Sequence, residues 1–507
     1  MMPRTVVVWT LKHACLVNIA RNMDKMWCNA FERDFSNAPR LLYVLGPFEN
    51  FTGDMIQELI NALISEHKLR RLHFQLLLTN RLDHIDFSHC PNLSNIPHLI
   101  GLRCQKLTSL NISNCSWITA SSVSSMIENL PQLKKLLLRN TKVNDNVLAT
   151  IHKFCQNLQV LDVFACPITD VGAINLCGRT HNNSRLCDNF KKLDISATKI
   201  GNTGASEILK TFKNLLHLGY ADVMEAVTLA SGQLGCASKD SENNDLNSQV
   251  FQLRTLTATG LKCKEVSPQS VYVACSVCPF ITEVIFYQGA INSSLQNLKY
   301  LQHLHSLEIT SDQAEDVTFF DGLVPLLKEI GSRLYSVGLF DIKDLDLGKL
   351  GVLCPALENL KCVMAAFNSV AFYESFLTGL ESKQIYRCLK KIMIVVGNDS
   401  TNFSAGTFQT MLVNAEHLQV MHLVNVQCMT SELLLQVIKC HGLKSLCKVY
   451  MESCNQLTVS GIRELLFCDN PLNSLIVKHC EEITRCDFDN LNRLVHQNNF
   501  DLAIEWV

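Results

Sequence analysis

A spacing of apolar residues recurs along this chain and constrains its fold more than any other feature. Each copy has a leucine, two variable residues, a second leucine, one variable residue, a third apolar residue and, three positions later, a cysteine or threonine. About fifteen copies follow one another at intervals of roughly 23 to 38 residues. The clear copies are Leu82-Ile85-Phe87-Cys90, Leu107-Leu110-Ile112-Cys115, Leu158-Leu161-Val163-Cys166, Leu446-Val449-Met451-Cys454 and Leu472-Leu475-Val477-Cys480; weaker copies begin near Leu133, Phe190, Leu215, Leu253, Ile281, Leu304, Leu334, Leu357, Leu389 and Leu418.

Each copy predicts a short strand followed by a helix. Successive side chains of a strand point to opposite faces, so the second leucine and the third apolar residue enter the core together. The cysteine or threonine then turns inward, where cysteine acts as a small hydrophobic residue. Helix-capping side chains follow, as Thr169 and Asp170 do before an apolar run. We therefore predict a curved α/β solenoid with parallel strands on its concave face and helices on its convex face.

Five of the 23 cysteines occupy this repeated packing position in the clear copies. They lack the dense spacing of a small secreted disulfide scaffold, which favours a reducing compartment. Cys275 and Cys278 form a CxxC pair without a second pair or spaced histidines, so we expect neither a zinc site nor a redox site there. The sequence predicts no metal and no cofactor.

Charge and the N-terminal residues exclude two classes of partner. The formal net charge of −2 removes the strong attraction to phosphate backbones that nucleic-acid-binding proteins need. The apolar run from Val6 to Trp9 is interrupted by Lys12 and His13 before a signal peptide or membrane span is complete. We expect no nucleic-acid or membrane partner, and a location in the cytoplasm, the nucleus or both.

Three segments are expected. Residues 1–65 do not fit the repeat and predict a helical N-terminal cap, and residues 66–500 hold the repeats. A polar stretch at about 231–248 is expected to form a surface loop inserted between repeats, because it cannot bury enough apolar surface to order itself. Residues 501–507 alternate in polarity and predict a closing strand.

From about residue 80 to 490, the repeat core followed by Ile168-Thr169-Asp170-Val171-Gly172 resembles the cysteine-containing leucine-rich repeats of F-box/LRR proteins. The resemblance is specific for the fold. It is much less specific for function, because one fold serves many tasks.

The N-terminal segment resembles two short adaptor motifs. Residues 10–19 match the elongin-binding box, with Leu11, Cys15 and Ile19 spaced four apart and so on one helical face. Residues 51–59 resemble the cullin-two box through Phe51, Met55 and Leu59, although Thr52 stands where that box has proline. The alternative interpretation is a plain cap that protects the first repeat from water.

The order of box, second helix and repeats is similar to the Zyg eleven and zer-one-type substrate receptors of cullin-RING ubiquitin ligases. The resemblance implies binding to elongin B/C and a cullin through the N-terminal segment, and to a protein substrate through the repeats. Those receptors continue into a C-terminal armadillo-like region that binds substrate, whereas leucine-rich repeats run to the end of this sequence, so the substrate-binding residues of those receptors are not carried over. The alternatives are an F-box-like adaptor of an SCF-type ligase, or a repeat scaffold or inhibitor unrelated to ubiquitin.

No catalytic motif is present in the sequence. It has no HExxH, P-loop, GxSxG or convincing GxGxxG motif, so we expect a binding protein and not an enzyme. The outward-facing strand positions are the expected partner surface, with aromatic residues as its anchors. The candidates are Arg139, Phe164, Tyr287, Phe340, Tyr450 and Glu452.

Overall fold

The computed structural model describes residues 10–30, 33, 47–88, 96–178, 185–232, 250–259, 265–311, 317–364, 385–397, 405–498 and 500–506. Its contacts divide the chain into an N-terminal unit, Trp9–Thr255, and a C-terminal unit, Leu256–Val507 with Met1–Val8. The polar loop predicted at 231–248 lies outside the described residues, apart from its first two positions. None of the described helices is both long and apolar enough to cross a membrane.

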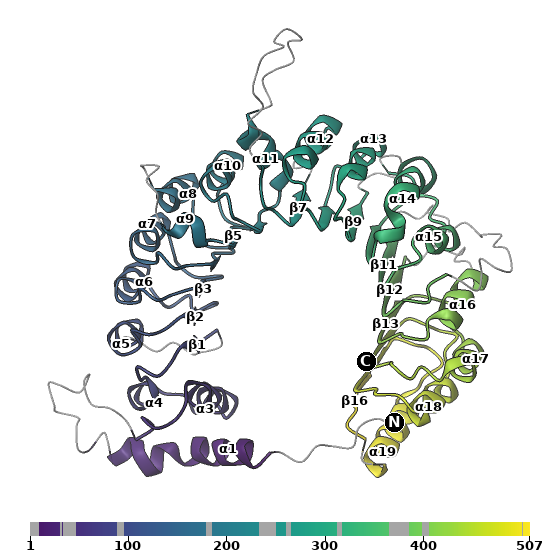
Figure 1. The fold of residues 1–507 in the computed structure, drawn as a ribbon. Coiled ribbons are helices and arrows are strands. Elements are labelled where there is room, and N and C mark those ends of the chain that lie inside the picture. The colour runs from purple at the N-terminus through teal and green to yellow at the C-terminus, as the bar shows by residue number, and fades with distance from the viewer. Residues whose placement is uncertain are drawn as a thin grey trace, which may run out of the picture. The chain divides into compact units, whose positions relative to one another are not determined.

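The N-terminal unit has one parallel sheet of six strands, in sequence order. Helices cover one side of this sheet, and the strands form the inner layer (Figure 1). The strands are β1 (His84–Asp86), β2 (Ser109–Asn111), β3 (Lys135–Leu137), β4 (Val160–Asp162), β5 (Lys192–Asp194) and β6 (His217–Gly219). The helices are α1 (Leu11–Met23), η1 (Asp24–Cys28), α3 (Gly53–Ser65), α4 (Arg71–Leu77), α5 (Ile96–Arg103), α6 (Ala120–Ile127), α7 (Asp145–Phe154), α8 (Asp170–Cys177), α9 (Arg185–Asn189), α10 (Asn202–Thr211) and α11 (Val223–Ser231).

A ten-stranded sheet, also in sequence order, organises the C-terminal unit. Its strands are β7 (Thr255–Ala258), β8 (Glu283–Phe286), β9 (Ser306–Thr310), β10 (Ser336–Phe340), β11 (Asn359–Met364), β12 (Lys391–Val396), β13 (Val420–Val424), β14 (Lys448–Glu452), β15 (Ser474–Lys478) and β16 (Ala503–Trp506). The helices are α12 (Pro268–Val277), α13 (Asn292–Leu295), η4 (Gln296–Tyr300), η5 (Phe319–Leu323), α14 (Val324–Ile330), η6 (Gly331–Arg333), α15 (Leu347–Leu353), α16 (Ala405–Asn414), α17 (Ser431–His441), α18 (Val459–Phe467) and α19 (Arg485–Gln497). The predicted α/β solenoid of strand-and-helix repeats is confirmed.

The repeat leucines stack into buried ladders. Leu110 of β2 lies opposite Leu136 of β3, which lies opposite Leu161 of β4, and all three are at most 1% exposed. This in-register stacking gives each repeat the core that a single repeat could not build alone.

The cysteine or threonine position lies just after a backbone turn. Asn114, Asn140 and Ala165, each immediately before this position, have positive φ values of 54 to 64°. Cys115 is 1% exposed, and its thiol donates to the carbonyl oxygen of Phe87 at 3.2 Å. The residue at the cysteine or threonine position therefore buries a small side chain, and it can donate a hydrogen bond to a carbonyl oxygen of the preceding repeat.

A second cysteine position, which the sequence analysis missed, lies where helices end. Cys155, Cys278 and Cys354 cap the C-termini of α7, α12 and α15, three residues before the first apolar position of the next repeat. All three are free thiols and fully buried. Burial raises the pKa of Cys155 and of Cys354 to about 12. The CxxC pair is thus explained by packing, since Cys278 occupies this position.

Candidate partner-binding site

Helix α1 carries the elongin-box-like residues and has one packed side. Thr10 begins the helix by accepting a hydrogen bond from the His13 amide through its side chain at 3.2 Å. The buried residues of the helix, which packs on α3, are Leu16, Val17, Ala20 and Met23. These positions form one helical face, so the opposite side of α1 is turned away from the unit.

That opposite side presents the predicted box residues. Leu11 is 81% exposed, Cys15 is exposed and Ile19 is half-buried. Met26, in the following η1 turn, is 60% exposed. Single exposed apolar residues are common, but a large leucine and a cysteine four residues apart on the side of α1 away from its buried residues form an apolar ridge available to a partner.

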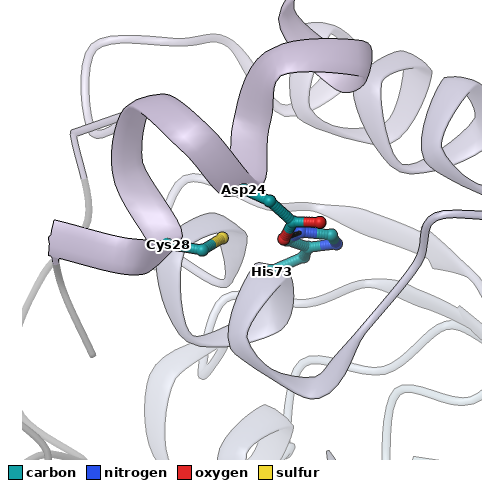
Figure 2. A group of neighbouring side chains, drawn as sticks. All are labelled: Asp24, Cys28 and His73. Carbon is teal, nitrogen blue, oxygen red and sulfur yellow. Dashed lines mark hydrogen bonds and ion pairs between the residues drawn. The ribbon is translucent and has the colours of Figure 1, made fainter. Parts of the chain in front are cut away.

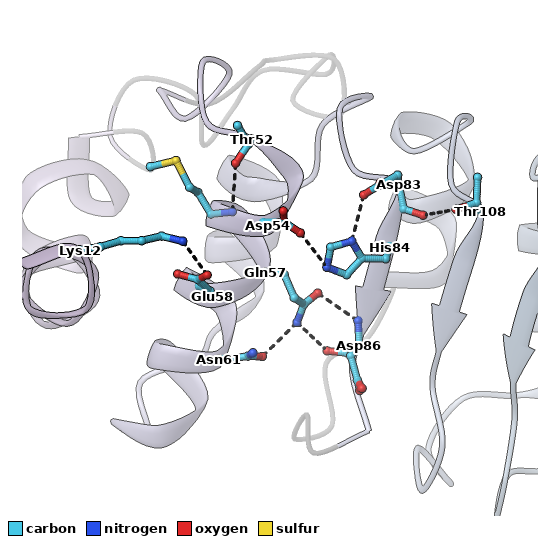
Figure 3. A network of polar contacts seen from close by, with 11 residues as sticks. Lys12, Thr52, Asp54, Gln57, Glu58, Asn61, Asp83, His84, Asp86 and Thr108 are labelled. Atoms are coloured by element: carbon cyan, nitrogen blue, oxygen red, sulfur yellow. Dashed lines mark hydrogen bonds and ion pairs between the residues drawn. The ribbon is translucent and has the colours of Figure 1, made fainter. Parts of the chain in front are cut away.

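Ion pairs fix α1 against α3 and the residue that follows it. Arg21 makes a two-point contact with Glu66, through Nε at 3.1 Å and Nη2 at 2.9 Å. Lys12 pairs with Glu58 of α3 at 2.7 Å (Figure 3). These contacts hold the helix in one rotational setting, which keeps the ridge outward.

Asp24, Cys28 and His73 form the one metal-type donor cluster found in the described part of the chain, with their donor atoms within 4.8 Å of one another (Figure 2). His73 is fully buried, and its Nδ1 accepts a hydrogen bond from the Arg70 amide at 3.1 Å. Nε2 therefore carries the ring proton and donates to Asp24 Oδ1 at 2.9 Å. Burial lowers the pKa of His73, which keeps the ring neutral.

Both His73 nitrogens are thus engaged, and neither has a lone pair for a metal. We interpret the cluster as a structural latch between η1 and α4. It explains how the chain after α1 is tied to the first repeat.

The cullin-box-like residues differ in how far they are buried. Phe51 precedes α3, and its ring packs edge-on against Phe48 with centroids 5.2 Å apart. Met55 is half-buried, and Leu59 is 0% exposed. Thr52 caps the helix by accepting from the Met55 amide at 3.3 Å. Leu59 belongs to the core of the unit and is not available at the surface, and the part of these three residues in partner binding stays a prediction.

Helix α3 instead closes the edge of the first sheet. The Gln57 side chain accepts from the Asp86 amide at 3.0 Å and donates to the Asp86 carbonyl at 3.2 Å (Figure 3). These two bonds replace the partners that a further strand would give to edge strand β1. Gln57, within the cullin-box-like residues 51–59, thus helps to cover a sheet edge that would otherwise be free to pair with other chains.

Two of the predicted concave-face residues interact with each other. The Arg139 guanidinium lies 4.3 Å from the centre of the Phe164 ring and binds Asp162 at 3.1 Å and Asp194 at 3.0 Å. Asp162 and Asp194 also accept the amide of the residue two positions on, at 2.9 and 3.0 Å. Arg139 is therefore held as part of a rigid surface over β3 to β5.

The other predicted residues belong to the C-terminal unit. Tyr450 donates to Glu452 at 2.5 Å, a contact that raises the pKa of the tyrosine to about 12, and its ring stacks on His422 at 4.2 Å. Tyr287 is 48% exposed, whereas Phe340 is half-buried beside Gly338. All of them lie at or next to the strands, and their part in partner binding stays a prediction.

Hydrogen bonds between successive repeats explain the Thr-Asp-x-Gly motif, which the sequence analysis interpreted only as a helix cap. In each case an aspartate of one repeat accepts two hydrogen bonds from the next repeat, and we call this contact the clasp. Asp145 accepts from both the amide and the hydroxyl of Thr169, each at 2.8 Å. Asp170 likewise accepts from the Gly201 amide at 2.7 Å and the Thr203 hydroxyl at 2.8 Å. A Cβ at Gly172 or Gly204 would overlap the carboxylate of the clasp. The recurring spacing of aspartate and glycine was the signal that could have revealed it.

A leucine-rich-repeat family model matches residues 103–126 and 154–177. The fold is similar to a yeast Rad7 and Elc1 complex structure, at TM-score 0.43 and 14% identity over 94% of this chain and 96% of that one. It is also similar to an internalin of Listeria monocytogenes, at TM-score 0.40 and 14% identity over 75% and 88% of the two chains. The parallel sheets and the repeat match make this chain a leucine-rich-repeat solenoid.

Proposed function

We propose that this protein is a non-catalytic substrate-recognition subunit of a cullin-RING ubiquitin ligase, acting in the cytoplasm or the nucleus. Its α1 ridge would bind elongin B/C, and its repeats would bind a protein substrate. Ubiquitin transfer would occur on partner enzymes, with this chain positioning the substrate. The observation that carries the proposal is the outward setting of Leu11 and Cys15 on a helix whose other side is packed.

The exposed apolar residues Leu11 and Cys15 suit partner binding better than capping. Burying the exposed part of an apolar side chain on a partner is favourable, by about 25 cal/mol per Å². A cap needs apolar residues only on its packed side, which Leu16, Val17 and Ala20 already supply. Leu11 and Cys15 contribute nothing to that packing, whereas the helix-in-groove mode of recognition uses residues of this spacing.

Recruitment of a cullin through α3 is not part of the proposal, because Leu59 is core. An F-box-like adaptor and a ubiquitin-independent scaffold remain the alternatives. Under both alternatives, the α1 ridge would not bind elongin.

Co-expression of the full chain with elongins B and C is expected to give a complex that survives size-exclusion chromatography. The Leu11→Ala plus Cys15→Ala variant should weaken the complex by about 30-fold or more, because truncating central anchors of an interface costs at least about 2 kcal/mol. The matched control is Val171→Ala plus Ile174→Ala, which removes two apolar side chains that are 55% and 45% exposed on α8. No complex with the wild-type chain, or equal weakening by both variants, would refute the proposal.

A further inference from the structure

Lysines stand on alternate strands of the N-terminal sheet, at the first position of the strand. Lys135 of β3 lies opposite Val160 of β4, and Val160 lies opposite Lys192 of β5. Both lysines are exposed, and the valine between them is half-buried. We call Lys135, Val160 and Lys192 the first lysine station.

The residues one position earlier repeat the arrangement. The Gln159 amide donates to the Lys134 carbonyl at 2.8 Å, and the Lys191 amide donates to the Gln159 carbonyl at 2.9 Å, which aligns Lys134, Gln159 and Lys191 across the same three strands. Both of these lysines are exposed. Four lysine side chains are therefore exposed at the end of the sheet where β3 and β5 begin.

The C-terminal unit contains the same arrangement. Lys391 of β12 lies opposite Val420 of β13, which lies opposite Lys448 of β14. The lysines are again exposed and the valine half-buried. We call these three residues the second lysine station. Lysine is depleted in strands, so strand formation does not explain this repeated choice.

None of these lysines forms an ion pair with a residue that the structure describes. Neighbouring Lys390, by contrast, pairs with Glu358 at 2.7 Å. The carboxylates closest along β4 and β5, Asp162 and Asp194, are bound by Arg139. The positive charge of Lys192 also helps to lower the pKa of His217, after the larger effect of burial. The first station thus presents two exposed positive charges that are not engaged in ion pairs with described residues.

We propose that each lysine station binds an extended acidic segment of a partner protein that crosses the strands, with its carboxylates on the two lysines and an apolar residue over the valine. Neighbouring strands lie about 4.8 Å apart, so the two lysines of a station are anchored about 10 Å apart. A polyproline II segment rises about 3.1 Å per residue with three residues per turn, so carboxylates three residues apart project on one side about 9 Å apart. The geometry therefore fits acidic residues at every third position.

A nucleic acid fits this surface less well. Asp86, Asp162 and Asp194 lie at the third position of β1, β4 and β5, one side-chain row from the lysines. A polynucleotide wide enough to cover both rows would meet these carboxylates, whereas a single peptide can follow the lysine row alone.

The lysine stations would be the sites where the substrate protein binds, so this inference rests on the proposed function. Its test uses the full chain without elongin. The probe is the fluorescein-labelled peptide Glu-Pro-Ala-Glu-Pro-Ala-Glu, followed by fluorescence anisotropy. Binding should be at least about threefold tighter than for Glu-Glu-Glu-Pro-Ala-Pro-Ala, and it should weaken strongly near 1 M salt, where the Debye length falls to about 3 Å. Failure here with an intact elongin complex would overturn the lysine stations and leave the proposed function standing.

Charge-reversal variants test the residues. Lys135→Glu plus Lys192→Glu in the first station, combined with Lys391→Glu plus Lys448→Glu in the second, should weaken binding about tenfold or more, since attractive pairs become repulsive. The control, Lys328→Glu plus Lys439→Glu, reverses two exposed helix lysines. It changes the net charge by the same amount as the double variant of either station, so it is compared with each double variant measured alone. Equal loss in the control, equal binding of the clustered peptide, or tighter binding of a 12-nucleotide oligothymidylate would each overturn the proposal.

Discussion

Replacing Phe74 with alanine is expected to lower the free energy of unfolding of the region around α4 and β1 by about 3 to 5 kcal/mol. Phe74 is 0% exposed, and its ring packs edge-on against Phe87 with centroids 4.8 Å apart. Phe87 is the third apolar residue of the first repeat, so the pair packs α4 against that repeat. Alanine would leave a cavity at this junction, because the surrounding backbone relaxes only partly.

Hydrogen exchange of the α4 and β1 amides measures this loss locally, which suits a repeat protein whose parts need not unfold together. Phe467→Ala is the matched control: Phe467 is 41% exposed, and its removal should cost less than about 1 kcal/mol at α18. Unchanged exchange at α4 and β1 in Phe74→Ala would show that the packing of α4 on the first repeat does not depend on this contact.

Gly204→Ala is expected to destabilise the α8 to α10 region by about 2 to 3 kcal/mol, although alanine normally favours a helix. The new Cβ would overlap Asp170 Oδ1 and lie 2.9 Å from Ile200 Cγ2. Asp170 would have to move, and the Gly201 amide and the Thr203 hydroxyl would lose their charged acceptor. Urea unfolding followed by circular dichroism, together with hydrogen exchange of α10, measures the effect.

Two comparisons make this prediction specific. In an Asp170→Ala background the overlap with the carboxylate is absent and only the close contact with Ile200 remains, so the added cost of Gly204→Ala should fall by about 2 kcal/mol, a coupling that a double-mutant cycle detects. Gly406→Ala, in a helix where a Cβ would meet nothing within 4 Å, should be neutral or stabilising by up to about 1 kcal/mol. Additive costs at positions 170 and 204 would rule out the clasp.

The fold was predictable because the leucine spacing fixes which side chains share a face. Leu110, Leu136 and Leu161 align in the sheet as their repeats predicted, since a one-residue slip would expose all of them. The inward position of Cys115 followed from the same spacing.

Contacts between repeats were less predictable, because they depend on side-chain direction in three dimensions. Spacing placed Phe51, Met55 and Leu59 on one face, but it could not show that Leu59 packs inward. The Gln57 contact with the Asp86 backbone joins residues from different elements and leaves no local pattern. The lysine stations became visible only once the register paired Lys135, Val160 and Lys192.

We propose above that the outer side of α1 is the surface that binds elongin. Alkylation of the full chain by iodoacetamide, read at each cysteine by mass spectrometry, tests it with internal standards. Cys15, Cys440 and Cys486 are exposed, whereas Cys155 is buried and burial raises its pKa to about 12, so it should not react. Saturating elongin B/C is predicted to slow alkylation of Cys15 at least about tenfold and to leave Cys440 and Cys486 unchanged. An unchanged rate at Cys15 in the complex would contradict the account.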